Sequence, residues 1–158
     1  MLFGGFVEHL VFTLYLLVAA FTFARVEIEI EGPWGWAENL PTWRIANRWT
    51  KLFYGSRPLT GYHLWLQLFV IVLAHFPFAV QVWDWSWHRE LRVIGFVILF
   101  FIIEDFLWFV LNPAYGLRRF RREHIWWHAP TWWWIMPRDY WIFSTIGIGI
   151  YLIGAMSR

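Results

Sequence analysis

The chain has 158 residues, of which 59% are hydrophobic and only 15% charged, whereas a soluble globular domain is roughly 45–50% apolar and about 25% charged. It has no cysteine, which excludes disulfides and thiolate metal ligands, and its net charge of +2 gives no basis for nucleic-acid binding. Aromatic side chains make up 23% of the residues, and such side chains favour membrane–water interfaces. The composition therefore indicates a single integral membrane domain over residues 1–158, with the lipid bilayer as its partner.

Four stretches of the sequence are apolar enough to cross a membrane as helices. A hydrocarbon core about 30 Å thick requires roughly 20 helical residues, and in lipid the backbone polar groups must be satisfied within each helix. The fold class predicted is all-α, a polytopic bundle of four transmembrane helices. These helices are expected at residues 2–24, 62–82, 91–112 and 139–156. Because no basic residue precedes the first apolar run and no small-residue cleavage site follows it, we interpret it as a retained helix rather than a signal peptide.

Residues 26–31 follow the first predicted helix and alternate between apolar and acidic side chains. This period of two predicts a short strand with Glu27, Glu29 and Glu31 on one face. Gly32 and Pro33 would end it. A solvated acidic face is the simplest role for such a strand.

Two segments between the spans, residues 42–54 and 116–128, combine an apolar face with a basic face. This pattern is typical of amphipathic helices that lie in the membrane interface. Basic side chains on such helices attract anionic lipid headgroups. The candidate headgroup-binding residues are Arg44, Arg48, Lys51, Arg118, Arg119 and Arg122.

The basic residues also predict the orientation of the chain. Ten of the 13 lie in the connections between the first and second and between the third and fourth predicted helices, and three lie on the opposite side. Because basic residues are enriched on the cytoplasmic side of membrane proteins, both long connections are expected in the cytoplasm. The sequence thus predicts a multi-pass protein of the cell membrane with both termini outside.

Two adjacent acids, Glu104 and Asp105, lie within the third predicted helix. They are roughly 10–12 Å from its inner end at Asn112, at about 1.5 Å per residue. Ionisable groups at this depth are costly unless they are paired or hydrated, and neighbouring carboxylates repel unless a proton or another cation neutralises one of them. We therefore expect a positively charged partner near the cytoplasmic boundary.

Histidines supply candidate partners for these acids. On a helix, His124 and His128 would have the i, i+4 spacing at which two imidazoles can hold one metal ion, and His63 begins the second predicted helix at the same level. Without cysteine, imidazole and carboxylate ligands suit zinc, iron or manganese. The residues predicted to converge on such a divalent metal are Glu104, Asp105, His124, His128 and His63.

A metal centre of this kind would make the protein a metal-dependent membrane enzyme acting on a lipid or another apolar substrate. Two alternatives stay open. Arg121 or Arg25 could neutralise the acids while the histidines only lie at the interface, or the acids could belong to a proton or ion path in a non-enzymatic carrier or subunit. The pair is not a zincin motif, because Ile125 rather than glutamate follows His124.

A second polar group lies toward the opposite side of the predicted bundle. Glu8 and His9 in the first helix and His75 in the second are roughly 10 Å inside the outer leaflet. Two imidazoles at equal depth on neighbouring helices can ligate a haem, so a haem- or pigment-binding electron-transfer protein using His9 and His75 is an alternative function. A hydrogen-bonded pair with Glu8, or a proton relay, would satisfy the same residues without a cofactor.

Three glycines, Gly147, Gly149 and Gly154, lie in the fourth predicted helix. Small residues allow another helix to approach closely in a membrane. The close approach would serve either packing inside the bundle or a homo-oligomer.

Overall fold

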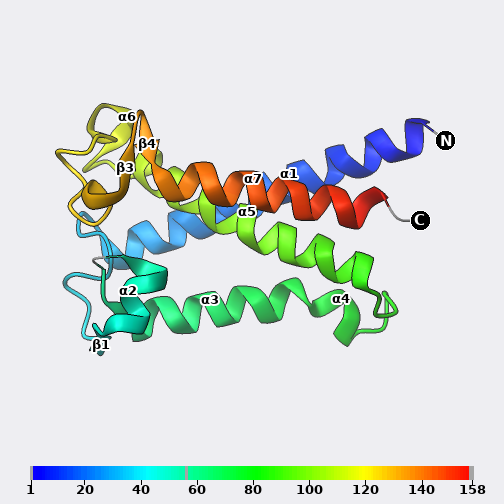
Figure 1. Cartoon of the computed structure of the whole chain (residues 1–158), viewed down its shortest axis with the longest axis horizontal. Helices are drawn as coiled ribbons and strands as arrows, with labels where there is room; N and C mark the ends of the chain where they lie inside the picture. Colours follow the sequence, from blue (N-terminus) through cyan, green and yellow to red (C-terminus); the bar gives the residue numbers. More distant parts are fainter. Residues whose placement is uncertain (1, 56, 157–158) are drawn as a thin grey trace.

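The computed structural model describes residues 2–55 and 57–156, and it is predominantly helical. Its three long helices are α1 (Leu2–Glu31), α5 (Trp87–Leu111) and α7 (Arg138–Met156). They run side by side along the molecule, with α5 packed against both α1 and α7 (Figure 1). All three are long and apolar enough to cross a membrane. This architecture agrees with the predicted all-α membrane fold.

The second predicted helix is interrupted, and its two parts are α3 (Gly61–Ala74) and α4 (Phe76–Ala79). The break falls at His75, two residues before Pro77. Proline has no backbone N–H, and its ring clashes with the carbonyl four residues earlier, so a regular helix cannot pass through this point. With 14 residues, α3 is shorter than the roughly 20 residues that a full crossing requires. Figure 1 shows α3 and α4 in line, extending along the same length as α5.

The prediction of a strand at residues 26–31 was wrong, because α1 continues as a helix to Glu31. In a helix of about 3.6 residues per turn, residues four apart share a face. Glu27 and Glu31 are therefore both buried, whereas Glu29 is exposed on the opposite side. The alternation seen in the sequence is a helix with its acids divided between a buried face and an exposed face.

Both predicted interfacial helices are shorter in the structure. Within residues 42–54, only α2 (Arg48–Tyr54) is an α-helix, because the Asn47 side chain caps its first turn. The preceding β1 (Arg44–Ile45) instead pairs antiparallel with β2 (Leu59–Thr60).

Within residues 116–128, only α6 (Gly116–Arg119) is an α-helix. The chain then proceeds through turns that bury Ile125, Trp127 and His128. The 3-10 turn η1 (Ala129–Thr131) and the hairpin of β3 (Trp132–Trp133) and β4 (Met136–Pro137) connect it to α7. A helix through His128 is therefore not formed, since burial of these side chains against the bundle overrides the local helical pattern.

The short elements other than α4 gather at one end of the molecule, and the start of α1, the end of α7 and α4 lie at the other (Figure 1). A hydrophobic core fills the end with the short elements, and its buried members come from α1, α5 and the connection after α6: Ala24, Ile28, Trp108, Phe109, Ile125 and Trp127. This core brings the acidic residues of α1 and α5 together.

Glycines set the close contact between α5 and α7. A Cβ atom added to Gly95 would lie 2.8 Å from the Cβ of Tyr151, and one added to Gly154 would lie 2.6 Å from the carbonyl oxygen of His88. Gly147 packs against Leu99 in the same interface, whereas no atom lies within 4 Å of a Cβ placed on Gly149. Gly147 and Gly154 thus serve packing inside the bundle.

Candidate functional site: a buried acid cavity

A cavity of about 190 Å³ lies where the helices meet the short elements. Its wall combines side chains from α1, α3, α5 and α7 with others from the connecting segments. Five carboxyl groups line this acid cavity: Glu27, Glu31, Glu104, Asp105 and Asp139. The basic side chains that line it are Arg57, His63 and His128. Carboxyl groups therefore outnumber the permanent positive charges in its wall.

Glu27 of α1 and Glu104 of α5 form the centre of the acid cavity. Their side chains are 9% and 4% exposed, and both line the same cavity. Within the described part of the chain, Glu104 Oε1 has no hydrogen-bond partner. A carboxylate only accepts hydrogen bonds, whereas a protonated carboxyl group also donates one. The two groups can therefore bond to each other only when one of them carries a proton.

Asp105 is the acceptor for two donors from other elements. His128 Nε2 lies 3.1 Å from Asp105 Oδ2, and the Tyr140 hydroxyl donates a hydrogen bond to the same oxygen. His128 is only 2% exposed, and its Nδ1 has no partner among residues 2–55 and 57–156. Asp105 thus fixes the orientation of His128 and leaves the second ring nitrogen free.

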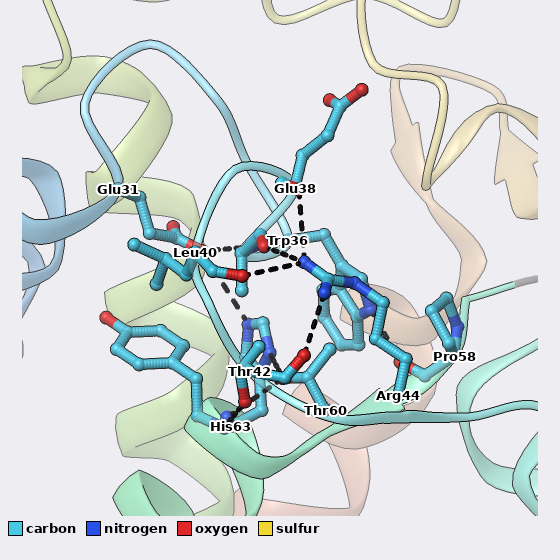
Figure 2. A network of polar contacts seen from close by, with 11 residues as sticks. Glu31, Trp36, Glu38, Leu40, Thr42, Arg44, Pro58, Thr60 and His63 are labelled. Atoms are coloured by element: carbon cyan, nitrogen blue, oxygen red, sulfur yellow. Dashed lines mark hydrogen bonds and ion pairs between the residues drawn. The ribbon is translucent and has the colours of Figure 1, made fainter.

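His63, at the start of α3, lies against Glu31. Its Nε2 is 3.9 Å from Glu31 Oε1, and its Nδ1 is 2.7 Å from the hydroxyl of Thr60. The indole of Trp36 stacks on the imidazole with 4.1 Å between ring centroids. Figure 2 shows His63 held between these side chains. Its environment is therefore set by the loop after α1 as well as by α3.

Arg57 supplies the permanent positive charge of the acid cavity. Its guanidinium lies 4.3 Å from the centre of the Trp36 ring and 3.6 Å from Asp139 Oδ2. Burial lowers the pKa of Arg57, while the carboxylates of Asp105 and Asp139 oppose that shift. The guanidinium is thus engaged by Asp139 and Trp36.

The loop at residues 32–43 covers this end of the bundle, and we call it the lid. Glu31 Oε1 accepts a hydrogen bond from the backbone N–H of Ala37 at 2.5 Å. Gly35 packs so closely on the Trp127 ring that an added Cβ would overlap it at 2.2 Å. The guanidinium of Arg44 donates to four backbone carbonyls of the lid: Ala37, Glu38, Leu40 and Thr42 (Figure 2).

The structure brings four of the five predicted metal-binding residues to one cavity and leaves the fifth outside it. Glu104, Asp105, His63 and His128 line the acid cavity, whereas His124 is exposed because the expected helix ends at Arg119. Across the described ranges, no group of three or more His, Asp or Glu side chains could hold a metal ion. The predicted metal site is therefore not supported.

Each of the two predicted haem ligands contacts a different partner. His9 Nδ1 lies 2.7 Å from the hydroxyl of Tyr151, and His75 Nε2 lies 3.1 Å from Glu90 Oε1. Glu8 pairs with Arg92 rather than with either histidine. Hydrogen bonds to these histidines were expected with Glu8 as the partner, whereas the observed partners are Tyr151 and Glu90.

The candidate headgroup-binding residues also differ in their surroundings. Arg44 is engaged by the lid, Arg119 and Arg122 each donate to one backbone carbonyl, and Arg48 lies over the ring of Trp49. Lys51 and Arg118 are exposed. Because the other four are also exposed, contact with headgroups stays a prediction for all six.

Sequence reasoning missed Glu27, Glu31, Arg57 and Tyr140 as members of the site. The spacing of Glu27 and Glu31 was a usable signal, because an extended first helix places residues four apart on one face. Comparison with protein-family models, curated proteins and solved structures found no match to this chain.

Proposed function

We propose that the protein is a small membrane carrier in which the acid cavity binds and releases protons. The observation that carries this proposal is the burial of Glu27 and Glu104 in one cavity, where their carboxyl groups can bond to each other only by sharing a proton. Two close carboxylates repel each other, and one proton shared between them removes that repulsion.

The location within the membrane supports the same function. Glu104 is seven residues before the end of α5 at Leu111, about 10 Å along the helix. A carboxylate at this depth in hydrocarbon is costly, and ionisable groups retained there commonly belong to proton relays and ion paths. Binding and release of a proton in the acid cavity would therefore be the step on which transport by this protein depends.

We infer four membrane crossings, with α3 and α4 together forming the second. The position of both termini at one end of the molecule supports an even number of crossings (Figure 1). Eight basic residues in the two long connections, with Arg25 in α1 and Arg138 at the start of α7, support a cytoplasmic position for the acid cavity under the positive-inside rule.

Along α5, an apolar stretch separates the polar groups near the two ends of the helix. Glu104 and Arg92 are 12 residues apart on α5, about 18 Å, and the residues between them in the sequence are apolar. The side chains of α5 therefore cannot pass a proton from one of these polar groups to the other. Proton transfer across the bundle would instead use a solute or water molecules that enter between the helices. This separation favours a carrier over a channel.

The proposal is tested by proton flux into liposomes that contain the purified full-length protein and a pH-sensitive dye. The variant with Glu27→Gln and Glu104→Gln should lose the proton flux, because the amide of glutamine does not bind and release a proton as a carboxyl group does. Glu29→Gln is the matched control, since Glu29 is on the same helix but its side chain is 74% exposed. Equal flux in the double variant and the wild type, or no flux in the wild type, would refute the carrier function.

An acid–base enzyme is the second candidate, and one observation favours it. Asp105 orients His128 and leaves its Nδ1 without a partner, which is the arrangement of a histidine held as a general base. The substrate class would be a lipid ester or amide entering from the cytoplasmic leaflet. Lipid products from vesicles incubated with wild type, but not with His128→Gln, would favour this candidate over the carrier.

A further inference from the structure

A second hollow, a groove of about 710 Å³, lies between α1, α5 and the α3–α4 segment. Its wall is mostly apolar and includes Phe12, Phe23, Val70 and Phe96. On α1 it extends from Glu8 to Val26, 18 residues or about 27 Å along the helix. This length approaches that of a bilayer's hydrocarbon core, about 30 Å, so the groove can take an extended single chain.

The groove and the acid cavity adjoin end to end along the same helices. On α1, Phe23 lines the groove, and Glu27, one turn later on the same face, lines the cavity; on α5, Phe100 and Glu104 are related in the same way. The same succession occurs on α3, where Gln67 lines the cavity and the groove begins two residues later. A ligand that lies in the groove therefore directs its end group toward the carboxyl pair.

The chemistry at this junction calls for a positively charged hydrogen-bond donor. Glu104 Oε1 is a buried acceptor with no partner in the described part of the chain, and His128 Nδ1, also buried without a partner there, accepts when the imidazole is neutral. An ammonium group offers three donors and no acceptor. The rings of Trp108 and Tyr140 also line the cavity, and aromatic faces attract cations. An anionic end group would instead meet the carboxyl groups of Glu27 and Glu104.

Arg57 does not already fill this role. Its guanidinium is paired with Asp139 and lies over the Trp36 ring, whereas the unpartnered oxygen belongs to Glu104. The positive charge that would match the paired carboxyls must therefore come from a proton or from a ligand.

We propose that the groove and the acid cavity together bind a single-chain amphiphile with a primary ammonium group, the chain in the groove and the ammonium beside Glu27 and Glu104. This rests on the proposed function, because the ammonium competes with the proton shared by the pair. The balance is one for one: a singly protonated pair that receives R–NH3+ releases one H+ and becomes two carboxylates facing the ammonium. Exchange of proton for amine is how the carrier would move its solute.

The test uses the purified full-length protein in detergent, with dodecylamine, dodecanol and dodecanoate as probes of equal chain length. Binding is followed by tryptophan fluorescence, and proton release is measured in weakly buffered solution. Dodecylamine should bind about ten-fold more tightly than dodecanol or better, because charge-assisted hydrogen bonds form only with the amine. About one proton should be released per bound amine, and none for dodecanol.

Variants separate the two parts of the site. Glu27→Gln with Glu104→Gln should remove the preference for the amine over the alcohol. Leu73→Trp should weaken all three probes, because Leu73 lines the groove; Leu68→Trp is the control, since Leu68 is exposed on the same helix and lines neither hollow.

Equal affinity for the three probes, or an amine preference that persists in the Gln double variant, would overturn the inference and leave the groove as a place for any lipid chain. Proton flux in liposomes without amine distinguishes this failure from that of the proposed function. Proton flux in the wild type without a preference for the amine would refute only the inference. Amine-specific binding without proton release or proton flux would refute the carrier function.

Discussion

The indole of Trp36 lies nearly parallel to the imidazole of His63, with an angle of 19° between the ring planes. The same indole donates a hydrogen bond to the carbonyl oxygen of Pro58 and carries the guanidinium of Arg57 on its ring. One side chain of the lid thus connects α3 with the segment that holds the cavity's permanent positive charge.

Replacement of Trp36 by alanine should loosen the lid, because the stacking, the hydrogen bond and the cation–π contact are lost together. Amide hydrogen exchange at residues 32–43, measured by mass spectrometry, should accelerate several-fold. Trp34→Ala is the control on the same loop, since Trp34 is 51% exposed. Equal exchange in the two variants would show that Trp36 does not hold the lid.

Arg44→Ala should destabilise the same loop from the other side, since four backbone carbonyls lose their donor. Hydrogen bonds from charged groups contribute about 1.5–3 kcal/mol each, with less for exposed ones. We expect a loss of about 1–3 kcal/mol, measured as a lower Tm in detergent. Arg48→Ala should change the Tm little, because Arg48 contacts only the exposed ring of Trp49. A similar loss in both would point to net charge rather than to the lid.

Tyr140→Phe should lower stability by about 1–2 kcal/mol, because the buried hydroxyl donates to Asp105 and phenylalanine cannot. Thermal unfolding in detergent measures the loss. Tyr15→Phe provides the comparison, since Tyr15 is 66% exposed on the surface of α1. A Tyr140→Phe protein as stable as the wild type would mean that the carboxylate finds another donor.

Larger residues at Gly95 should disrupt the α5–α7 contact. Gly95→Leu places side-chain atoms where the backbone and Cβ of Tyr151 already lie, and overpacking of this kind costs about 1–3 kcal/mol. Gly149→Leu should be nearly neutral, because the space around a Cβ at that position is open. The two variants can be ranked by the temperature at which half the protein aggregates in detergent; the reverse order would contradict the packing.

The long helices could be predicted because stretches of 18 or more residues with high mean hydropathy and few charges leave few alternatives to a membrane helix. The acids of α5 were found for the same reason, since charge within such a run is conspicuous. Residues 26–31 were misassigned because β-branched side chains alternate there with glutamates, while tertiary packing against α5 decides the structure.

His124 and His128 show the limit of spacing as a signal. Their separation suits a helix, yet burial of Ile125 and Trp127 against Phe109 and Trp108 pulls the chain into turns. Only His128 reaches the acid cavity. Arg57 and Tyr140 could not be assigned from the sequence, because their contacts with Asp139 and Asp105 join segments distant in the chain.

The break at His75 gives α3 a mechanical consequence. Because the helix ends there, α3 is a short rigid rod with His63 near one end and Leu73 near the other. Any tilt of this rod that separates Leu73 from α1 also shifts the His63 imidazole relative to Glu31. If a chain enters the groove as proposed and tilts α3, the same movement would change the electrostatics of the carboxyl cluster.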